Sequence, residues 1–421
     1  KIADTRYFIY CIIGEFFLSL RKTMSKIKLL ILLTVFIDII GVGIVIPILP
    51  FYVESYSHSP LLITSLVAVF SLCSFISAPI IGAWSDRVGR KPMLIMSIFS
   101  TALGWFIFAE AKSIPLLFLG RIVDGLAAGN FPIAQSYLSD IAKTDKERTA
   151  NLGIIGAVFG IGFIIGPFLG GMLSQLGHTV PFYFVGTLAL LNAILGIFML
   201  PETHLNRTNH PISLNPLRPI FKAFIDRKLR TNYAAWFMFG VAIASYQAVF
   251  ALYLKDVFGF NEVSGGLMFA ASGLMLALNQ GIAMKHVWLR WFREPTLELY
   301  TLLCAGFGLI FMQVPQFLVF SIGFIVATFA HSILRVVMTS QVVGMSDQTR
   351  RGEVLGILSS VMSVSMTIAP IAAGSLYQYH HRVPFLFSAL CMIVAFVLLF
   401  LRKRRVSRLS LPENVPSIPE M

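Results

Sequence analysis

Charged residues are scarce in this chain of 421 residues, because Asp, Glu, Lys and Arg make up only 13% of it. A typical soluble domain holds about 25%. Hydrophobic residues make up 57%, and the mean hydropathy is +0.80. A soluble protein of this composition would expose larger apolar patches than solubility tolerates. The composition therefore excludes a cytosolic enzyme, a disordered chain and a collagen-like fibre, and it predicts an all-α polytopic membrane protein.

Cysteine is scarce too, and the usual signatures of catalysis are missing. The four cysteines stand apart in apolar stretches without a CxxC pair, which favours small buried apolar residues over disulfide or metal partners: Cys11, Cys73, Cys304 and Cys391. The sequence has no GxxxxGK(S/T) loop, no GxSxG, no HExxH and no cytosolic segment long enough for an ATPase domain. We expect no enzyme, no cofactor and no metal site, and no process driven by ATP hydrolysis within this chain.

Long apolar runs are abundant instead. A bilayer core of about 30 Å requires roughly 17 to 25 apolar residues per helix. Twelve such runs occupy residues 28–50, 60–83, 92–110, 115–138, 149–175, 181–201, 231–254, 261–285, 296–314, 316–340, 352–377 and 383–401. The sequence therefore predicts twelve transmembrane helices, with both termini on the same side of the membrane.

The positive charges lie on one side of these spans. If both termini are cytoplasmic, only Lys112, Lys255 and Arg382 among the 33 Lys and Arg residues fall in loops of the opposite side. This is the positive-inside rule. The net charge of +13 therefore describes topology and argues against a nucleic-acid partner. We expect a monomer in a bacterial cytoplasmic membrane, surrounded by the lipid bilayer.

The chain divides into two similar halves. A polar, basic stretch at 202–230 separates a six-helix half at 24–201 from a second at 231–401, and a basic tail follows at 402–421. Residues 147–175 align without a gap on 350–378, with ten of 29 positions identical. Transporters with such repeats bind substrate near the bilayer midplane, between the halves. The first 23 residues hold an apolar stretch too short to span, and we expect them to be a dispensable extension.

A stretch between the second and third spans combines glycines, a carboxylate and cations at fixed spacing. It reads GAWSDRVGRK over residues 82–91. A loop shaped by the positive-inside rule alone would require only Arg and Lys. The stretch resembles the signature loop of the major facilitator superfamily, G-x-L-a-D-r-x-G-r-k, with Trp84 in place of Leu. The resemblance implies a gate built from a tight glycine turn and salt bridges, using Gly82, Asp86, Arg87, Gly89, Arg90, Lys91 and, at the end of the fourth span, Asp140.

Three further motifs are similar to those of the drug:proton antiporter branch of that superfamily, so the resemblance covers residues 24–405. They are IGVGIVIPILP at 40–50, RIVDGLAAG at 121–129, and a fifth-span motif formed by Gly162, Gly166, Pro167, Gly170 and Gly171. Small residues at this spacing can also be a simple packing face. The chain resembles an exporter of the tetracycline-resistance type. The second copy of the signature loop, at 285–293, lacks its Gly and Asp.

Charge inside the spans is the most informative chemistry, and only four ionisable residues other than His lie clearly inside them: Asp38, Arg121, Asp124 and Arg335. An ionised residue in mid-membrane costs about 2.5–3.5 kcal/mol, so it faces a cavity or a partner. Asp38 and Asp124 lie about 14 Å and 12 Å in from opposite edges, at a similar depth, with Arg121 one turn from Asp124. One interpretation is a permanent ion pair. The other is a proton site, in which Arg121 keeps one carboxylate ionised while the other takes up a proton, and we favour Asp38 as the carrier.

Polar residues of other spans are candidates for the substrate cavity. A single mid-span polar group is usually an interhelical hydrogen bond worth about 0.6 kcal/mol. Collectively, some of them must line a cavity, and the candidates are Gln135, Tyr246, Gln247, Gln280 and Arg335. Phe and Met are abundant and suit an adaptable apolar pocket.

The signature loop also predicts a conformational preference. Asp86 is expected beside the start of the eleventh span near Gly352, where a helix N-terminus attracts a carboxylate. Asp140 can hold Arg90. These contacts can form only when the cytoplasmic side is closed, so they should favour the outward-open state.

Three functions remain in competition. The first is a proton-coupled exporter of a small amphipathic compound such as a drug, an antibiotic or a siderophore. The second is a proton-coupled uptake symporter on the same fold, and the third is a membrane anchor or receptor that transports nothing. The glycine motif of the fifth span and the buried carboxylates favour the first.

Overall fold

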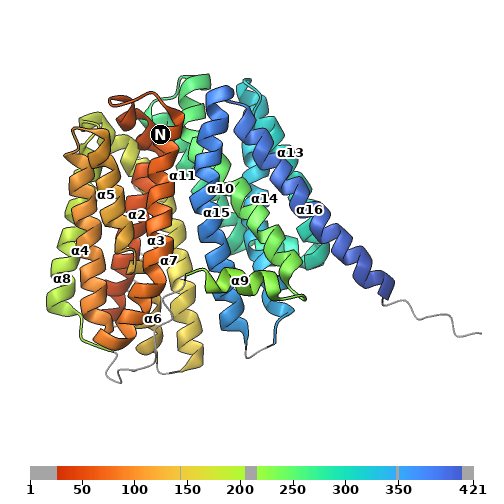
Figure 1. Cartoon of the computed structure of the whole chain (residues 1–421), viewed down its shortest axis with the longest axis horizontal. Coiled ribbons are helices and arrows are strands. Elements are labelled where there is room, and N and C mark those ends of the chain that lie inside the picture. Colours follow the sequence, from red (N-terminus) through yellow and green to blue (C-terminus); the bar gives the residue numbers. More distant parts are fainter. Residues whose placement is uncertain (1–25, 143, 204–215, 348–349, 410–421) are drawn as a thin grey trace, which may run out of the picture. The chain divides into compact units, whose positions relative to one another are not determined.

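The structure is a computed structural model that describes residues 26–142, 144–203, 216–347 and 350–409. The described chain is helical, without strands (Figure 1). The predicted extension at 1–23 lies outside the described residues. Twelve helices are long and apolar enough to cross a membrane, which confirms the predicted fold class.

Seventeen helical segments follow one another along the described part of the chain. They are α2 (Lys26–Glu54), α3 (Pro60–Val88), α4 (Arg90–Ala109), α5 (Ile114–Leu126), α6 (Asn130–Asp140), α7 (Asp145–Leu173), η1 (Ser174–Leu176), α8 (Val180–Met199), α9 (Arg218–Ile225), α10 (Arg230–Phe258), α11 (Glu262–Leu278), η2 (Asn279–Trp288), α12 (Leu289–Trp291), α13 (Glu294–Met312), α14 (Phe317–Gly344), α15 (Arg351–Tyr379) and α16 (Val383–Leu409). Helices α5 and α6 share the fourth span, and α11, η2 and α12 share the eighth.

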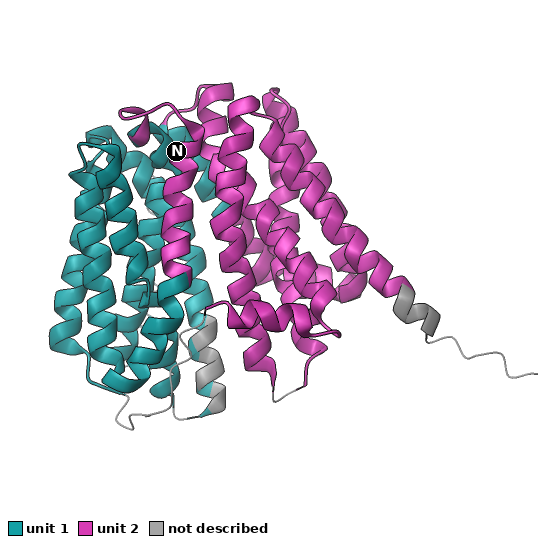
Figure 2. Ribbon diagram, viewed as in Figure 1, with its two compact units in different colours: residues 1–52, 76–214, 262–273 teal, residues 53–75, 215–261, 274–421 magenta. Residues whose placement is uncertain are grey.

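Two compact units make up the chain, and they do not coincide with the two halves of the sequence (Figure 2). Unit 1 holds residues 1–52, 76–214 and 262–273, and unit 2 holds 53–75, 215–261 and 274–421. Each unit therefore includes the first part of one helix from the other half. In unit 1, a Cβ added at Gly171 of α7 would lie 2.7 Å from the Glu262 carbonyl oxygen of α11.

Unit 2 repeats this arrangement with the matching glycine. A Cβ at Gly374 of α15 would lie 2.9 Å from the Cα of Leu61 in α3. Gly171 and Gly374 occupy the same position in the two aligned segments of the sequence. The internal repeat therefore appears in the structure as two close helix crossings of the same kind.

The fourth span is broken in its middle, where a continuous helix was expected. Helix α5 ends at Leu126, and α6 begins at Asn130. The break leaves carbonyl groups of α5 without helical partners. Hydroxyl groups from neighbouring helices compensate, because Ser77 donates to the carbonyl of Gly125 at 2.8 Å and Ser100 to that of Val123 at 2.7 Å. Inside a membrane such compensation is required.

The signature stretch is mostly helical, which corrects the expected loop. Helix α3 continues to Val88, and α4 starts at Arg90. The turn is made by Gly89 alone, whose φ of 121° suits only glycine. Gly82 lies inside α3, and a Cβ there would meet nothing within 4 Å. The second span was expected to end at residue 83, where the apolar run ends, but the polar residues that follow continue α3 to Val88.

Candidate functional site

A series of hydrogen bonds connects two carboxylates of unit 1, the half-buried Asp38 and the buried Asp124. The Nδ2 of Asn130, at the start of α6, donates to Oδ1 of Asp38 on α2 at 2.8 Å and lies 3.1 Å from Oγ1 of Thr101 on α4. The Thr101 hydroxyl is in turn a hydrogen-bond partner of Asp124 on α5. Asp38 and Asp124 are therefore linked through two side chains that the sequence analysis did not single out.

Arg121 lies beside Asp124, at the far end of this series of hydrogen bonds. Its Nη1 is 3.7 Å from Oδ2 of Asp124, one helical turn away, and both residues are buried. The guanidinium carbon lies 3.8 Å from the ring centroid of Trp105 and 4.7 Å from that of Phe108. A cation over an aromatic face is stabilised by the ring quadrupole, most strongly where water is excluded. The aromatic contacts thus support a charged Arg121 inside the helix bundle.

The fifth-span motif packs α7 directly against the helix that carries Asp38. A Cβ at Gly162 would lie 2.8 Å from Cγ2 of Ile39, and one at Gly166 would lie 2.9 Å from the carbonyl oxygen of Ile40. Gly170 approaches Ile44 in the same way, and Pro167 lies against Gly43. The motif therefore forms a packing face, which was the simpler interpretation, and it sets the position of α2 over the turns that directly follow Asp38.

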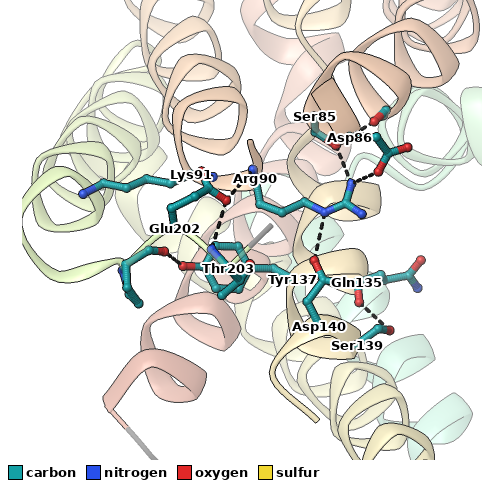
Figure 3. Close-up of polar contacts among 12 residues, drawn as sticks. Ser85, Asp86, Arg90, Lys91, Gln135, Tyr137, Ser139, Asp140, Glu202 and Thr203 are labelled. Carbon is teal, nitrogen blue, oxygen red and sulfur yellow. Dashed lines mark hydrogen bonds and ion pairs between the residues drawn. The ribbon is translucent and has the colours of Figure 1, made fainter. Parts of the chain in front are cut away.

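The expected contact of Arg90 with Asp140 is present, as part of a larger cluster at the end of α3 (Figure 3). Arg90 Nη1 lies 2.6 Å from Oδ1 of Asp86 and 2.7 Å from the Ser85 hydroxyl. Its Nε donates to Oδ2 of Asp140 at 3.0 Å. Arg90 is buried, so a single cation joins two carboxylates from α3 and α6. The expected contact of Asp86 with the start of α15 stays a prediction.

Glu202, a residue outside the predicted set, completes this cluster. Its carboxylate accepts from the backbone nitrogens of Arg90 at 2.9 Å and Lys91 at 3.2 Å (Figure 3). These are the first residues of α4, whose N–H groups have no helical partner. A Cβ at Gly89 would overlap the same carboxylate, which is a second reason for glycine there. Arg87 is exposed in the last turn of α3.

The cavity candidates are spread over several helices. Gln135 is half-buried on α6, and its carbonyl accepts from the Ser139 hydroxyl at 2.9 Å (Figure 3). Tyr246 is buried on α10 near Phe250, with Gln247 as a hydrogen-bond partner. Gln280, in the π-helical turn η2, donates to the carbonyl of Ser332 at 3.4 Å. Arg335 lies on α14 with an exposed side chain.

Two further predictions require correction. Glu298 of α13 is buried although the sequence analysis counted only four ionisable residues other than His inside the spans. It was missed because it stands close to the expected start of its span. Cys304 is exposed and not buried, whereas Cys391 is buried as expected. Among the described residues no three His, Cys, Asp or Glu side chains form a group that could hold a metal ion.

Comparison with known proteins settles the family. The sequence profile described as Major Facilitator Superfamily matches residues 31–325 and 290–419. The chain belongs to this superfamily. Solved structures of other superfamily transporters share its fold: the nucleoside transporter NupG has a TM-score of 0.74 at 14% identity and covers 90% of this chain and 100% of its own. A bacterial homologue of the human lysosomal transporter Spinster has a TM-score of 0.74 at 16% identity, covering 91% and 99%.

Curated relatives within the superfamily are named for drug resistance. Multidrug resistance protein 2 of Bacillus subtilis strain 168 is 26% identical, over 92% of this chain and 98% of its own length. Tetracycline resistance protein class E of Escherichia coli is 27% identical, over 84% and 89%. Quinolone resistance protein NorA of Staphylococcus aureus strain MSSA476 is 25% identical, over 92% and 99%.

Proposed function

We propose that this superfamily member is a proton-coupled exporter of a small amphipathic compound, working by alternating access as a monomer. The observation that carries the proposal is the hydrogen-bonded connection from Asp38 through Asn130 and Thr101 to Asp124, beside a buried Arg121. A permanent ion pair would require only Arg121 and one carboxylate. The second carboxylate and its two linking side chains serve a proton that comes and goes.

Asp38 is the proton carrier in this proposal. Asp124 has a cation one turn away, which favours its ionised form. Asp38 has only the neutral amide of Asn130 as its hydrogen-bonding partner among the described contacts. Protonation of Asp38 removes the charge that Asn130 stabilises, and deprotonation restores it. Substrate binding and proton binding thereby compete for the same arrangement of α2 and α6.

The remaining predicted residues take supporting roles. The cluster of Asp86, Arg90 and Asp140 is the cytoplasmic gate, and the five fifth-span motif residues hold α7 against α2 and α11. The substrate lies against residues drawn from Gln135, Tyr246, Gln247, Gln280 and Arg335. The asymmetry of Lys and Arg between loops supports a bacterial cytoplasmic membrane location with both termini in the cytoplasm.

The test is proton release driven by substrate in everted membrane vesicles. The vesicles are acidified inside by respiration, and a fluorescent pH probe follows the interior after tetracycline, a quinolone or ethidium is added. An exporter releases protons from the vesicle as it takes up the compound. Asp38→Asn should abolish this response while the compound still binds. Asp124→Asn should leave it in place.

A matched control separates coupling from folding. Thr34 lies on α2, one turn from Asp38, and its Oγ1 is 3.1 Å from Nδ2 of Asn192. Thr34→Val removes a buried hydrogen bond of the same helix without touching the carboxylates, and should keep the response. If Asp38→Asn retains full exchange, or if Asp124→Asn alone abolishes it, Asp38 is not the carrier. Proton uptake in parallel with substrate would instead identify a symporter.

A further inference from the structure

Helix α9 presents an apolar face outward. Phe221, Phe224 and Ile225 are 60%, 74% and 76% exposed, whereas Ala223 between them is buried. An ordinary surface helix turns its apolar side toward the core and its charges toward water. Helix α9 does the reverse, so three large apolar side chains project from a short amphipathic helix.

Ion pairs with the start of α15 fix this orientation. Nζ of Lys222 lies 2.5 Å from Oε1 of Glu353, and Nη2 of Arg350 lies 3.2 Å from Oδ2 of Asp226. Arg350 also contacts Glu353 at 3.3 Å, so four charges form one network. The network occupies the side of α9 that faces α15. Figure 1 shows α9 crossing α15 near the end where α15 begins.

The level of α9 is that of a membrane surface. Glu353 lies in the first turn of α15, and the backbone of Arg230, the first residue of α10, donates to the carbonyl of Asp226. Both α10 and α15 are membrane spans that begin with basic residues. A helix lying across the starts of two spans is at the depth where acyl chains meet headgroups.

The charges around α9 match an anionic surface. Exposed cations precede and follow the apolar face along the chain: Arg218, Arg227, Lys228 and Arg230. The acidic residue among them, Asp226, is held by Arg350. A basic helix with an apolar face and cations at its edges is the form in which proteins bind anionic leaflets.

We propose that α9 is an interfacial anchor. Phe221, Phe224 and Ile225 insert among the acyl chains of the leaflet in which α10 and α15 begin, and the flanking cations bind anionic phospholipid headgroups. The ion pairs among Lys222, Asp226, Arg350 and Glu353 attach the anchored helix α9 to the start of α15. The anchor is independent of the proposed proton exchange, because it concerns only the lipid.

The experiment measures the depth of residue 224 in the full-length protein. The variant Phe224→Trp is reconstituted in phosphatidylcholine vesicles with or without phosphatidylglycerol, and bromines on the acyl chains serve as the quencher. Emission of the native tryptophans is subtracted with the wild-type protein. Arg227→Trp is the control, because Arg227 is exposed and follows the apolar face without belonging to it. The added emission at residue 224 should be largely lost, and more so with phosphatidylglycerol, whereas that at 227 should persist.

A second pair of variants tests the headgroup contact. Arg218→Gln with Lys228→Gln should remove the phosphatidylglycerol dependence in the Phe224→Trp background. Lys112→Gln, an exposed cation between α4 and α5, should leave it unchanged. Equal quenching at 224 and 227 would overturn the proposal, as would quenching at 224 that ignores phosphatidylglycerol. Emission at 224 that is blue-shifted yet unquenched would show a protein partner on this face and would overturn it as well.

Discussion

Helices α4 and α5 in unit 1 and helices α13 and α14 in unit 2 pack in the same way, but only the first pair carries charged side chains beside the glycines at which the two helices cross. A Cβ at Gly104 would lie 2.8 Å from both the Gly120 carbonyl oxygen and the Asp124 Cβ. A Cβ at Gly308 would lie 3.0 Å from the carbonyl oxygen of Gly323 and 2.8 Å from the nitrogen of Ala327. Ala327 therefore stands in unit 2 where Asp124 stands in unit 1.

The same alignment of the two helix pairs shows which residues of unit 2 correspond to Arg121 and Thr101. Phe324 stands three residues before Ala327, as Arg121 stands before Asp124, and Ala305 stands three residues before Gly308, as Thr101 stands before Gly104. Phe324 stacks on Phe250 with ring centroids 5.4 Å apart. Unit 2 thus achieves the same helix packing with apolar and aromatic side chains alone. Packing accounts for the glycines, and the charges of unit 1 serve another purpose, which we take to be proton exchange.

The largest effect should come from placing the missing carboxylate in unit 2. Ala327→Asp introduces a charge into a buried position of a membrane helix, where an unpartnered carboxylate costs about 2.5–3.5 kcal/mol. We expect a severe loss of folded protein, measured as the monodisperse fraction in size-exclusion chromatography. Adding Phe324→Arg should recover part of it by pairing the charge. If Ala327→Asp alone folds like the wild type, unit 2 tolerates a buried carboxylate at the position that Asp124 occupies in unit 1.

Breaking the connection between the carboxylates should slow exchange without unfolding the protein. A buried hydrogen bond to a charged group contributes about 1.5–3 kcal/mol, so Asn130→Ala should slow proton-coupled transport roughly tenfold to a hundredfold. Thr101→Val should do the same to a smaller extent, and the Thr34→Val control should not. Combined with Thr101→Val, Asn130→Ala should slow exchange by less than the product of the two single effects, because both variants break the same connection. Fully multiplicative effects would show that Asn130 and Thr101 act independently.

Substitution of Gly104 and of Gly308, the glycines at the two helix crossings, should destabilise the protein equally. Gly104→Ala and Gly308→Ala both force a methyl group against a neighbouring backbone, and overpacking of this kind costs about 1–3 kcal/mol. Thermal unfolding in detergent should therefore show similar losses for the two variants. Only Gly104→Ala should also impair exchange, because it displaces Asp124. Equal impairment of exchange by both would remove the functional difference between the pairs.

The smallest effect should be a shift between conformers. Asp86→Asn removes one carboxylate from Arg90, and a loss of about 1.4 kcal/mol changes the conformer ratio tenfold. We expect a folded protein that still binds substrate, favours the inward-open state and exports slowly. Cysteine accessibility from each side is the measurement. Lys285→Gln, in the second copy of the loop that lacks the carboxylate, should leave the balance near wild type. If Asp86→Asn leaves the ratio of the two conformers unchanged, the cluster does not act as a gate and its charges only set the orientation of the chain in the membrane.

Sequence alone predicted the twelve spans because a helix that crosses a bilayer must be long and apolar throughout. It also predicted the contact of Arg90 with Asp140, because the signature spacing is specific. It could not predict Asn130 and Thr101, since each is an ordinary polar residue until the register between α2, α4 and α6 is known. The break at 127–129 escaped for a similar reason. Hydroxyl groups such as those of Ser77 and Ser100 help make a broken helix tolerable inside a membrane, and the sequence does not show which hydroxyl groups lie beside the break.

That break has a mechanical consequence for α6. The helix is 11 residues long, or about 16 Å, and it is separated from α5 by a joint at 127–129. Its first residue, Asn130, holds Asp38, and its last residue, Asp140, holds Arg90. Because a helix of this length is stiff, α6 holds the contact with Asp38 at a fixed distance from the contact with Arg90. In the proposed mechanism, protonation of Asp38 would therefore change the load on Asn130 at one end of α6 and, through the helix, on the contact of Asp140 with Arg90 at the other.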